Sequence, residues 1–141
     1  MTALATVPAT ARELARSPAR LKELSPTAIA AFRDIAAHWG LSPLEQRILL
    51  GIVPQSTYTK YMRDPRTATL SYDTLARISH LYGIFKALNV LLPDERLADA
   101  WIAQPNDHPL FKGASPKDVM LDGTLESIAA VRAYLDAERG W

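Results

Sequence analysis

Cysteine is absent from the 141-residue sequence. A disulfide framework, a thiolate metal site and a cysteine nucleophile are therefore excluded, and the composition fits a reducing compartment. Long apolar runs are also missing, so no segment is expected to span a bilayer. Residues 1–18 lack the basic start and the continuous apolar stretch of a signal peptide. We therefore expect a cytoplasmic protein with no membrane partner.

Groupings typical of catalysis are sparse as well. The three histidines are His38, His80 and His108, and the sequence completes neither a catalytic triad nor a metal-ligand spacing around them. We therefore predict that the protein is not an enzyme and binds no cofactor and no metal. A hydrophobic content of 48% predicts a folded chain, either one compact domain or two small helical modules that share a core.

No stretch alternates apolar and polar residues for long enough to predict a sheet. Apolar residues instead recur at three- and four-residue steps, and proline, serine and glycine mark where such segments start and stop. We therefore predict an all-α protein, with helices over residues 25–40, 43–51, 55–63, 71–90, 93–101, 116–121 and 124–138.

The longest predicted helix, residues 71–90, has an apolar face broad enough to place it at the centre of the fold. Gly83 lies within it, and because glycine disfavours helices it indicates a close helix crossing or a kink. Residues 1–24 are predicted to be a flexible arm. The apolar face of the long helix comprises Leu75, Ile78, Leu81, Tyr82, Phe85 and Leu88.

Charge divides the chain into two halves. Residues 1–70 carry nine Lys and Arg against five Asp and Glu, whereas residues 71–141 carry seven against ten, so the net charges are +4 and −3. A basic half joined to an acidic half suggests a polyanion as partner of the first and a different partner for the second. An ordinary soluble surface explains the basic excess equally well.

Residues 43–63 have the pattern of a helix-turn-helix. Ser42 and Glu45 have the spacing of a capping box at the start of a short helix, and Gly51 is suited to end it. The pattern of two short helices joined by a glycine-containing turn is typical of proteins that bind the major groove of DNA. Helical hairpins of this kind also occur in all-α proteins that do not bind DNA. Residues 25–70 are the predicted DNA-binding region.

The second helix of this motif is expected to lie exposed, because the first helix and the turn bury Leu44, Ile48 and Ile52. Glutamine can form paired hydrogen bonds with adenine, hydroxyl groups reach phosphates or base edges, and Lys and Arg neutralise phosphates. The candidate DNA-binding residues are Gln55, Ser56, Thr57, Tyr58, Lys60 and Arg63.

Three motifs stand out in the C-terminal half: the segment over residues 77–93, the sequence Pro-Leu-Phe-Lys-Gly-Ala-Ser-Pro over 109–116, and Val-Arg-Ala-Tyr-Leu-Asp over 131–136. With these motifs, residues 71–141 resemble the toxin-binding domain of Xre/MbcA/ParS-type antitoxins. The segment before them resembles the Xre-type helix-turn-helix that such proteins carry.

The resemblance implies a type II antitoxin that neutralises a RES-domain toxin, an enzyme that depletes NAD, by sealing its active site. It also implies operator binding that autoregulates the operon, and a homodimer within a larger toxin–antitoxin complex. Residues 132–141 are expected to serve binding and to be dispensable for folding. In this family the C-terminal end reaches the toxin, which points to Arg132, Tyr134, Glu138, Arg139, Gly140 and Trp141.

A different function stays open from the residues alone. The chain has the features expected of a stand-alone helix-turn-helix transcription regulator with an effector domain. That function predicts a pocket for a small molecule in the acidic half, whereas an antitoxin requires a protein partner for the last helix.

Overall fold

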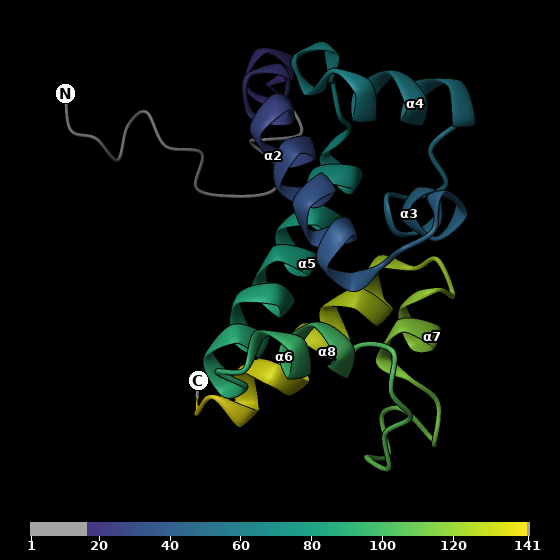
Figure 1. Ribbon diagram of the computed structural model, residues 1–141. Coiled ribbons are helices and arrows are strands. Elements are labelled where there is room, and N and C mark those ends of the chain that lie inside the picture. Colours follow the sequence, from purple (N-terminus) through teal and green to yellow (C-terminus); the bar gives the residue numbers. More distant parts are fainter. Residues whose placement is uncertain (1–16, 141) are drawn as a thin grey trace, which may run out of the picture.

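The computed structural model describes residues 17–140, and every regular element in that range is helical (Figure 1). The all-α prediction is therefore confirmed. No helix in this range combines the length and the apolar content needed to cross a bilayer. In chain order the elements are α2 (Pro18–Trp39), α3 (Pro43–Leu49), α4 (Gln55–Arg63), the short 3-10 helix η2 (Pro65–Thr67), α5 (Tyr72–Leu91), α6 (Glu95–Trp101), α7 (Pro116–Met120) and α8 (Leu125–Glu138).

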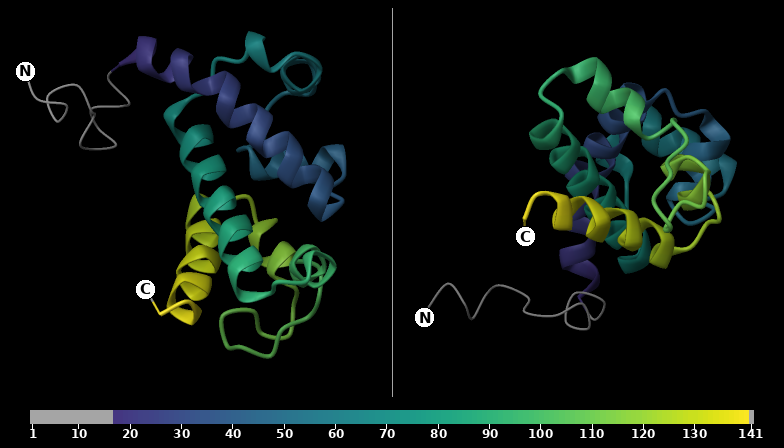
Figure 2. Two further views of the ribbon diagram at one scale, coloured as in Figure 1. Left: turned by 60° about the vertical axis from the view of Figure 1, so that its left-hand side comes forward. Right: turned by 90° about the horizontal axis from the view of Figure 1, so that it is seen from below.

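Helix α5 occupies the centre of the fold, as its broad apolar face predicts. It packs against α2 on one side and α8 on the other, and both neighbours are visible along it in Figure 2. Tyr82 of the predicted apolar face is not buried, because it is 49% exposed and lines a groove between α2 and α5. The buried face of α5 is made by Ile78, Leu81, Ile84, Ala87 and Leu88.

Helix α2 begins at Pro18, well before the predicted start at Ser25, so part of the predicted flexible arm is helical. Two Ser-Pro pairs, at residues 17–18 and 25–26, precede the apolar positions of this helix, and the earlier one starts it. Ser25 is instead fully buried: its hydroxyl donates to the Leu21 carbonyl at 2.6 Å and accepts from the Leu70 amide at 2.8 Å. This tertiary contact explains why the helix continues through Pro26. Residues 1–16 of the arm lie outside the described range.

The start of α3 is fixed by the predicted capping box. The Ser42 hydroxyl accepts from the Glu45 amide at 3.1 Å, and the Ser42 amide donates to the Glu45 carboxylate at 2.9 Å. The hydrogen bond from the Ser42 amide is the largest of the contacts that lower the pKa of Glu45, and the Lys117 ammonium lowers it further. Because Lys117 lies 3.2 Å from the same carboxylate, the capping box also links α3 to α7.

The turn after α3 is held against α5. Gly51 has a φ of +98°, a conformation that favours glycine, and a Cβ there would lie 3.1 Å from the Asp73 carboxylate. The Thr74 hydroxyl donates to the Leu50 carbonyl at 2.8 Å, so the first turn of α5 fixes the carbonyl end of α3. The turn that leads from α3 to α4 is therefore anchored on α5.

Helices α5 and α8 approach each other closely at Gly83, as the glycine within a helix predicted. A Cβ at Gly83 would lie 2.5 Å from Nε of Arg132. The Arg132 side chain crosses α5 at this point and pairs with Asp136 at 3.6 Å within its own helix. Glycine at this position makes room for the arginine and brings the two helices together.

A cluster of aromatic rings ties the loop between α6 and α7 to the body of the protein. Phe111 is only 1% exposed and meets Trp101 edge-on, with ring centroids 6.0 Å apart. Tyr134 of α8 stacks on Trp101 at 6.2 Å and lies 4.6 Å from the His108 ring. The loop therefore contributes to the core beside α8.

We predict that Ser25→Ala lowers the free energy of unfolding by about 1–3 kcal/mol, because it leaves the buried Leu70 amide without an acceptor. Chemical denaturation measures this loss. Ser56→Ala, at an exposed position of α4, is the matched control and should change stability by less than about 0.5 kcal/mol. Equal effects of the two substitutions would contradict the role given to Ser25.

Candidate DNA-binding helix and toxin-binding surface

Helix α4 presents one polar face to solvent. Its exposed residues follow three- and four-residue steps, so they line one side of the helix. Thr59 belongs to this face although sequence reasoning missed it, and the same spacing that selects its neighbours would have found it. The five exposed residues are Gln55, Ser56, Thr59, Lys60 and Arg63.

The opposite side of α4 packs onto the protein and includes two of the predicted DNA-binding residues. Thr57 and Tyr58 are both half-buried. The Tyr58 hydroxyl donates to Oε1 of Gln46 in α3 at 2.7 Å, and burial raises the pKa of Tyr58. Tyr58 thus fastens α4 to α3, and it does not share the exposed face with Lys60.

The expected burial of Leu44 and Ile52 is wrong, since they are 60% and 69% exposed. The end of α3 supplies the core residues instead, namely Leu49 and Leu50, which are almost fully buried. Ile52 follows them in the turn with a φ of +61°, and this left-handed conformation directs its side chain away from the core. Ile48 is half-buried.

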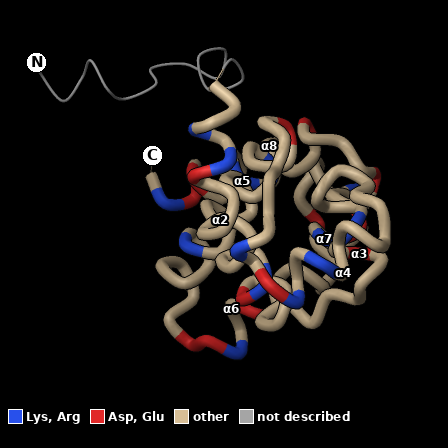
Figure 3. Tube along the Cα trace, turned by 90° about the horizontal axis from the view of Figure 1, so that it is seen from above, with Lys and Arg blue, Asp and Glu red and all other residues tan. Residues whose placement is uncertain are grey.

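The far end of α4 is held by α2. Nη1 of Arg33 donates to the Met62 carbonyl at 3.2 Å, one of the carbonyls that a helix leaves unpaired at its C-terminus. Figure 3 shows basic segments along α4, where Lys60 and Arg63 lie. A rigidly mounted helix with amide, hydroxyl and cationic side chains on one face has the chemistry needed to contact base edges and phosphates.

The predicted toxin-binding residues divide into two groups. Arg132 and Tyr134 are half-buried and point to different parts of the protein. Arg132 lies against Gly83 of α5, whereas Tyr134 stacks in the aromatic cluster. The structure does not bring these two side chains together, and both of them hold α8 in place.

The second group lies at the end of α8. Glu138 is exposed, Arg139 is half-buried and Gly140 follows with a φ of +85°. Trp141 lies outside the described residues. The expectation that residues 132–141 are dispensable for folding is wrong, because Leu135 within them is only 2% exposed and belongs to the core.

One cluster of metal-ligating residue types occurs in residues 17–140. His38 of α2 lies beside Glu95 and Asp99 of α6, and their ligand atoms are all within 4.8 Å of one another. Nδ1 of His38 is 2.9 Å from Asp99 and 3.5 Å from Glu95, so the group forms an ion-paired contact between α2 and α6. The hydrogen bond with Asp99 is the main cause of the raised pKa of His38.

Together, the mounted α4 helix and the separate helical surface around α8 define a DNA-binding protein with a second binding domain. Comparison with known proteins identifies both parts. Residues 19–83 match the antitoxin Xre-like helix-turn-helix domain, and residues 87–140 match the antitoxin Xre/MbcA/ParS C-terminal toxin-binding domain. The chain belongs to the Xre-type antitoxins, and neither matched domain is enzymatic.

A relative of much the same length is also found among known proteins. The uncharacterized protein y4oB of Sinorhizobium fredii (strain NBRC 101917 / NGR234) is 44% identical over 124 residues. The match covers 88% of this chain and 93% of that protein. The two proteins therefore correspond over most of their length.

We predict a pH-dependent contact between α2 and α6. Because the folded state raises the pKa of His38, the ion pair contributes its full stability below the ordinary value of 6.5 and loses it as the pH rises through the raised pKa. The melting temperature of the wild type should therefore fall relative to that of His38→Gln over this range. Asp99→Asn removes the main cause of the raised pKa of His38, so its melting temperature should depend on pH in the same way as that of His38→Gln. Identical pH profiles for all three proteins would contradict the prediction.

Proposed function

We propose that this antitoxin neutralises a RES-domain toxin with the C-terminal end of α8, and that it represses its own operon by binding the operator through α4. Figure 1 shows that α4 and the C-terminus lie at opposite ends of the protein, and Figure 2 agrees. This separation is the observation that carries the proposal, because a toxin and a DNA duplex both fit on one copy without competing for a surface.

The DNA-binding half of the proposal relies on the exposed face of α4. Gln55 is placed near the start of the helix, where helix-turn-helix proteins contact base edges. Lys60 and Arg63, one and two turns further on, are suited to phosphates. Tyr58 and Thr57 act by positioning the helix from its inner side. Because operator DNA is cytoplasmic, we expect the protein to act in the cytoplasm.

The proposed toxin contact depends on how firmly α8 is packed against the rest of the protein. Arg132 in the Gly83 crossing and Tyr134 in the aromatic cluster fix the helix from two sides. Glu138 at the end of the helix, and Arg139 and Gly140 after it, are then held at the edge of the protein where a toxin can meet them. Because α8 is already fixed before the toxin binds, less conformational entropy is lost on binding.

The RES toxin and its effect on NAD come from the family resemblance and not from any contact in the structure. What supports an antitoxin over a regulator with a small-molecule effector is the match of residues 87–140 to a toxin-binding domain. The alternative, a transcription regulator with a small-molecule effector, predicts a pocket in the acidic half. A groove between α2 and α5 takes its lining from both halves, residues 24–31 and 72–82, and all of these residues fall within the helix-turn-helix match and none within the toxin-binding match.

We predict that Lys60→Ala combined with Arg63→Ala weakens binding to the promoter fragment upstream of its own gene. Each lost phosphate contact should reduce the slope of log K against log salt by about 0.9. Electrophoretic mobility shift or anisotropy titrations at several salt concentrations measure both effects. Arg96→Ala combined with Lys112→Ala is the charge-matched control, because it removes two exposed positive charges outside the helix-turn-helix. Unchanged affinity and slope in the double variant would remove α4 from the DNA interface.

We predict that deleting residues 139–141 keeps the fold, since α8 ends at Glu138, but abolishes neutralisation. The test is co-expression with the protein encoded beside the antitoxin gene, the proposed RES-domain toxin, with growth and cellular NAD as readouts. The wild type should preserve NAD and co-purify with the toxin, whereas the truncated chain should not preserve NAD. Glu126→Gln, exposed at the other end of α8, is the control.

Two results would contradict this proposal. A truncated chain that still protects cells would remove the tail from the inhibitory contact. A neighbouring protein that neither lowers NAD nor binds the antitoxin would overturn the assignment of a RES toxin. Circular dichroism of the truncated chain separates both results from a folding defect.

A further inference from the structure

A histidine and two carboxylates converge where α2 meets α6. His38 lies in the last turn of α2, whereas Glu95 and Asp99 lie about one turn apart on α6. The ligand atoms of these three side chains are within 4.8 Å of one another, and they make the one cluster of this kind in residues 17–140. Neither the proposed DNA contact nor the proposed toxin contact uses them.

The distances around His38 match those of a tetrahedral zinc site. Ligand atoms bound to zinc at about 2.0–2.1 Å lie about 3.3 Å apart in a tetrahedron. Nδ1 of His38 is 2.9 Å from Oδ2 of Asp99 and 3.5 Å from Oε1 of Glu95, so two of the three separations are close to this value. The Glu95 side chain is 70% exposed, so it can rotate to bring its carboxylate closer to that of Asp99.

The cluster carries more negative charge than its own residues balance. The ion pairs between described residues give Glu95 and Asp99 no partner besides His38. Asp34, one turn before His38 on α2, adds a third carboxylate charge that acts on the imidazole. A single imidazole neutralises at most one of these charges, whereas a divalent cation balances two.

The ligands are held by elements that are already fixed in the core. The His38 ring meets Phe85 of α5 edge-on, with ring centroids 5.1 Å apart and an interplanar angle of 76°. Ala98 is only 1% exposed, so the turn of α6 that carries the half-buried Asp99 packs firmly against the protein. A site that is positioned in advance loses little conformational entropy when it binds a ligand.

The donor atoms favour zinc over the hard divalent cations. Magnesium and calcium are bound by oxygen ligands, whereas an imidazole nitrogen suits zinc and other transition metals. One nitrogen and two carboxylate oxygens leave a fourth position for water, as in zinc sites with three protein ligands. Local spacing in the sequence predicted no metal, because Asp99 lies 61 residues after His38 and only the fold brings them together.

We propose that His38, Glu95 and Asp99 form a zinc site, with Nδ1 of the histidine and one oxygen of each carboxylate as ligands and water in the fourth position. His38 lies in the helix-turn-helix match and both carboxylates lie in the toxin-binding match, so the ion ties the two domains together. Zinc stabilises the folded chain because unfolding separates its ligands. Without metal, the same side chains form the ion-paired contact between α2 and α6.

The first test compares two glutamates. Glu95 and Glu126 are both exposed in the first turn of a helix, but only Glu95 belongs to the cluster. Calorimetric titration of the metal-free full chain with zinc chloride should show one site per chain with a micromolar or lower Kd. Glu95→Gln should weaken this affinity about tenfold or more, whereas Glu126→Gln should leave it unchanged. A wild type that does not bind zinc in the micromolar range, or equal affinities for all three proteins, would overturn the proposal.

A spectroscopic test identifies the histidine as a ligand. Because the chain contains no cysteine, His38→Cys introduces a single thiol at the site. Cysteine has a shorter reach than histidine, but zinc–sulfur bonds are about 0.2–0.3 Å longer than zinc–nitrogen bonds, which offsets part of the difference. Cobalt(II), used in place of zinc, should give this variant a thiolate-to-metal charge-transfer band that the wild type lacks. Absence of the band at cobalt concentrations that saturate the wild type would place the metal elsewhere and contradict the proposal.

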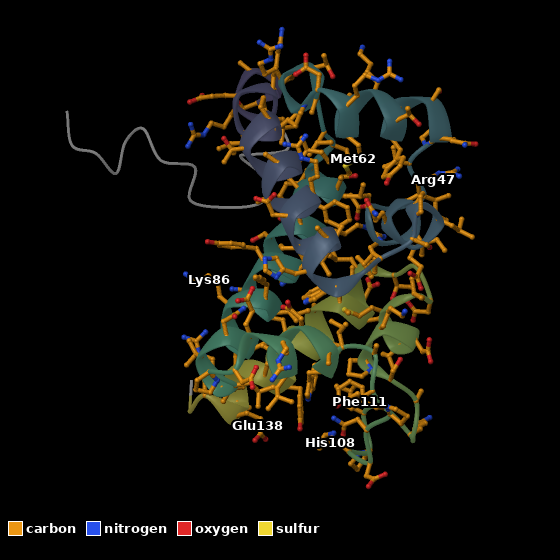
Figure 4. All side chains as sticks on the ribbon, in the orientation of Figure 1. Arg47, Met62, Lys86, His108, Phe111 and Glu138 are labelled. Carbon is orange, nitrogen blue, oxygen red and sulfur yellow. The ribbon has the colours of Figure 1, made fainter. Side chains whose placement is uncertain are left out.

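A melting experiment separates loss of the site from loss of the fold. His108→Gln is the control for removing a histidine, since His108 lies beside Phe111 in the loop after α6 (Figure 4) and belongs to no metal-ligating cluster of residues 17–140. Zinc should raise the melting temperature of the wild type and of His108→Gln but not that of His38→Gln. Circular dichroism of the metal-free variants checks that each is folded. An equal rise in all three proteins would count against the site.

Discussion

The burial of α5 between α2 and α8 is the constraint on which the rest of the structure depends. The two family matches meet within this helix, the first ending at residue 83 and the second beginning at residue 87. Its first turn holds the helix-turn-helix through Thr74 and Leu50, and its later turns receive α8 at Gly83. Two domains that are separate in sequence therefore share one hydrophobic core, and neither can bury its apolar face without α5.

This shared helix explains how one small chain presents two binding ends. The α4 face is fixed through α3 and the turn, while the end of α8 is fixed through Arg132 and the aromatic cluster, and both sets of contacts converge on α5. Binding at one end can influence the other by altering the packing on α5.

Local patterns in the sequence predicted most of the fold. The helix bounds, the Ser42 capping box, the α4 helix and the close approach at Gly83 all follow from spacing and from the conformational properties of single residues. The start of α2 did not, because the choice between two Ser-Pro pairs is made by the Leu70 amide, far along the chain. Periodicity marks an apolar face without saying how much of it a neighbour covers, which is why Leu44 and Ile52 were wrongly expected to be buried and why Tyr82 of the predicted apolar face is exposed. The inward role of Tyr58 likewise depends on Gln46 in another helix.

The account is tested most directly by native-state hydrogen exchange along α5. If one core unites both domains, slowly exchanging amides in the first and second halves of α5 should open with the same free energy, equal to that of global unfolding, together with those of α2 and α8. A second half of α5 that opens with α8 at a clearly lower free energy, while α2 and the first half stay protected, would show two independent domains and contradict the account.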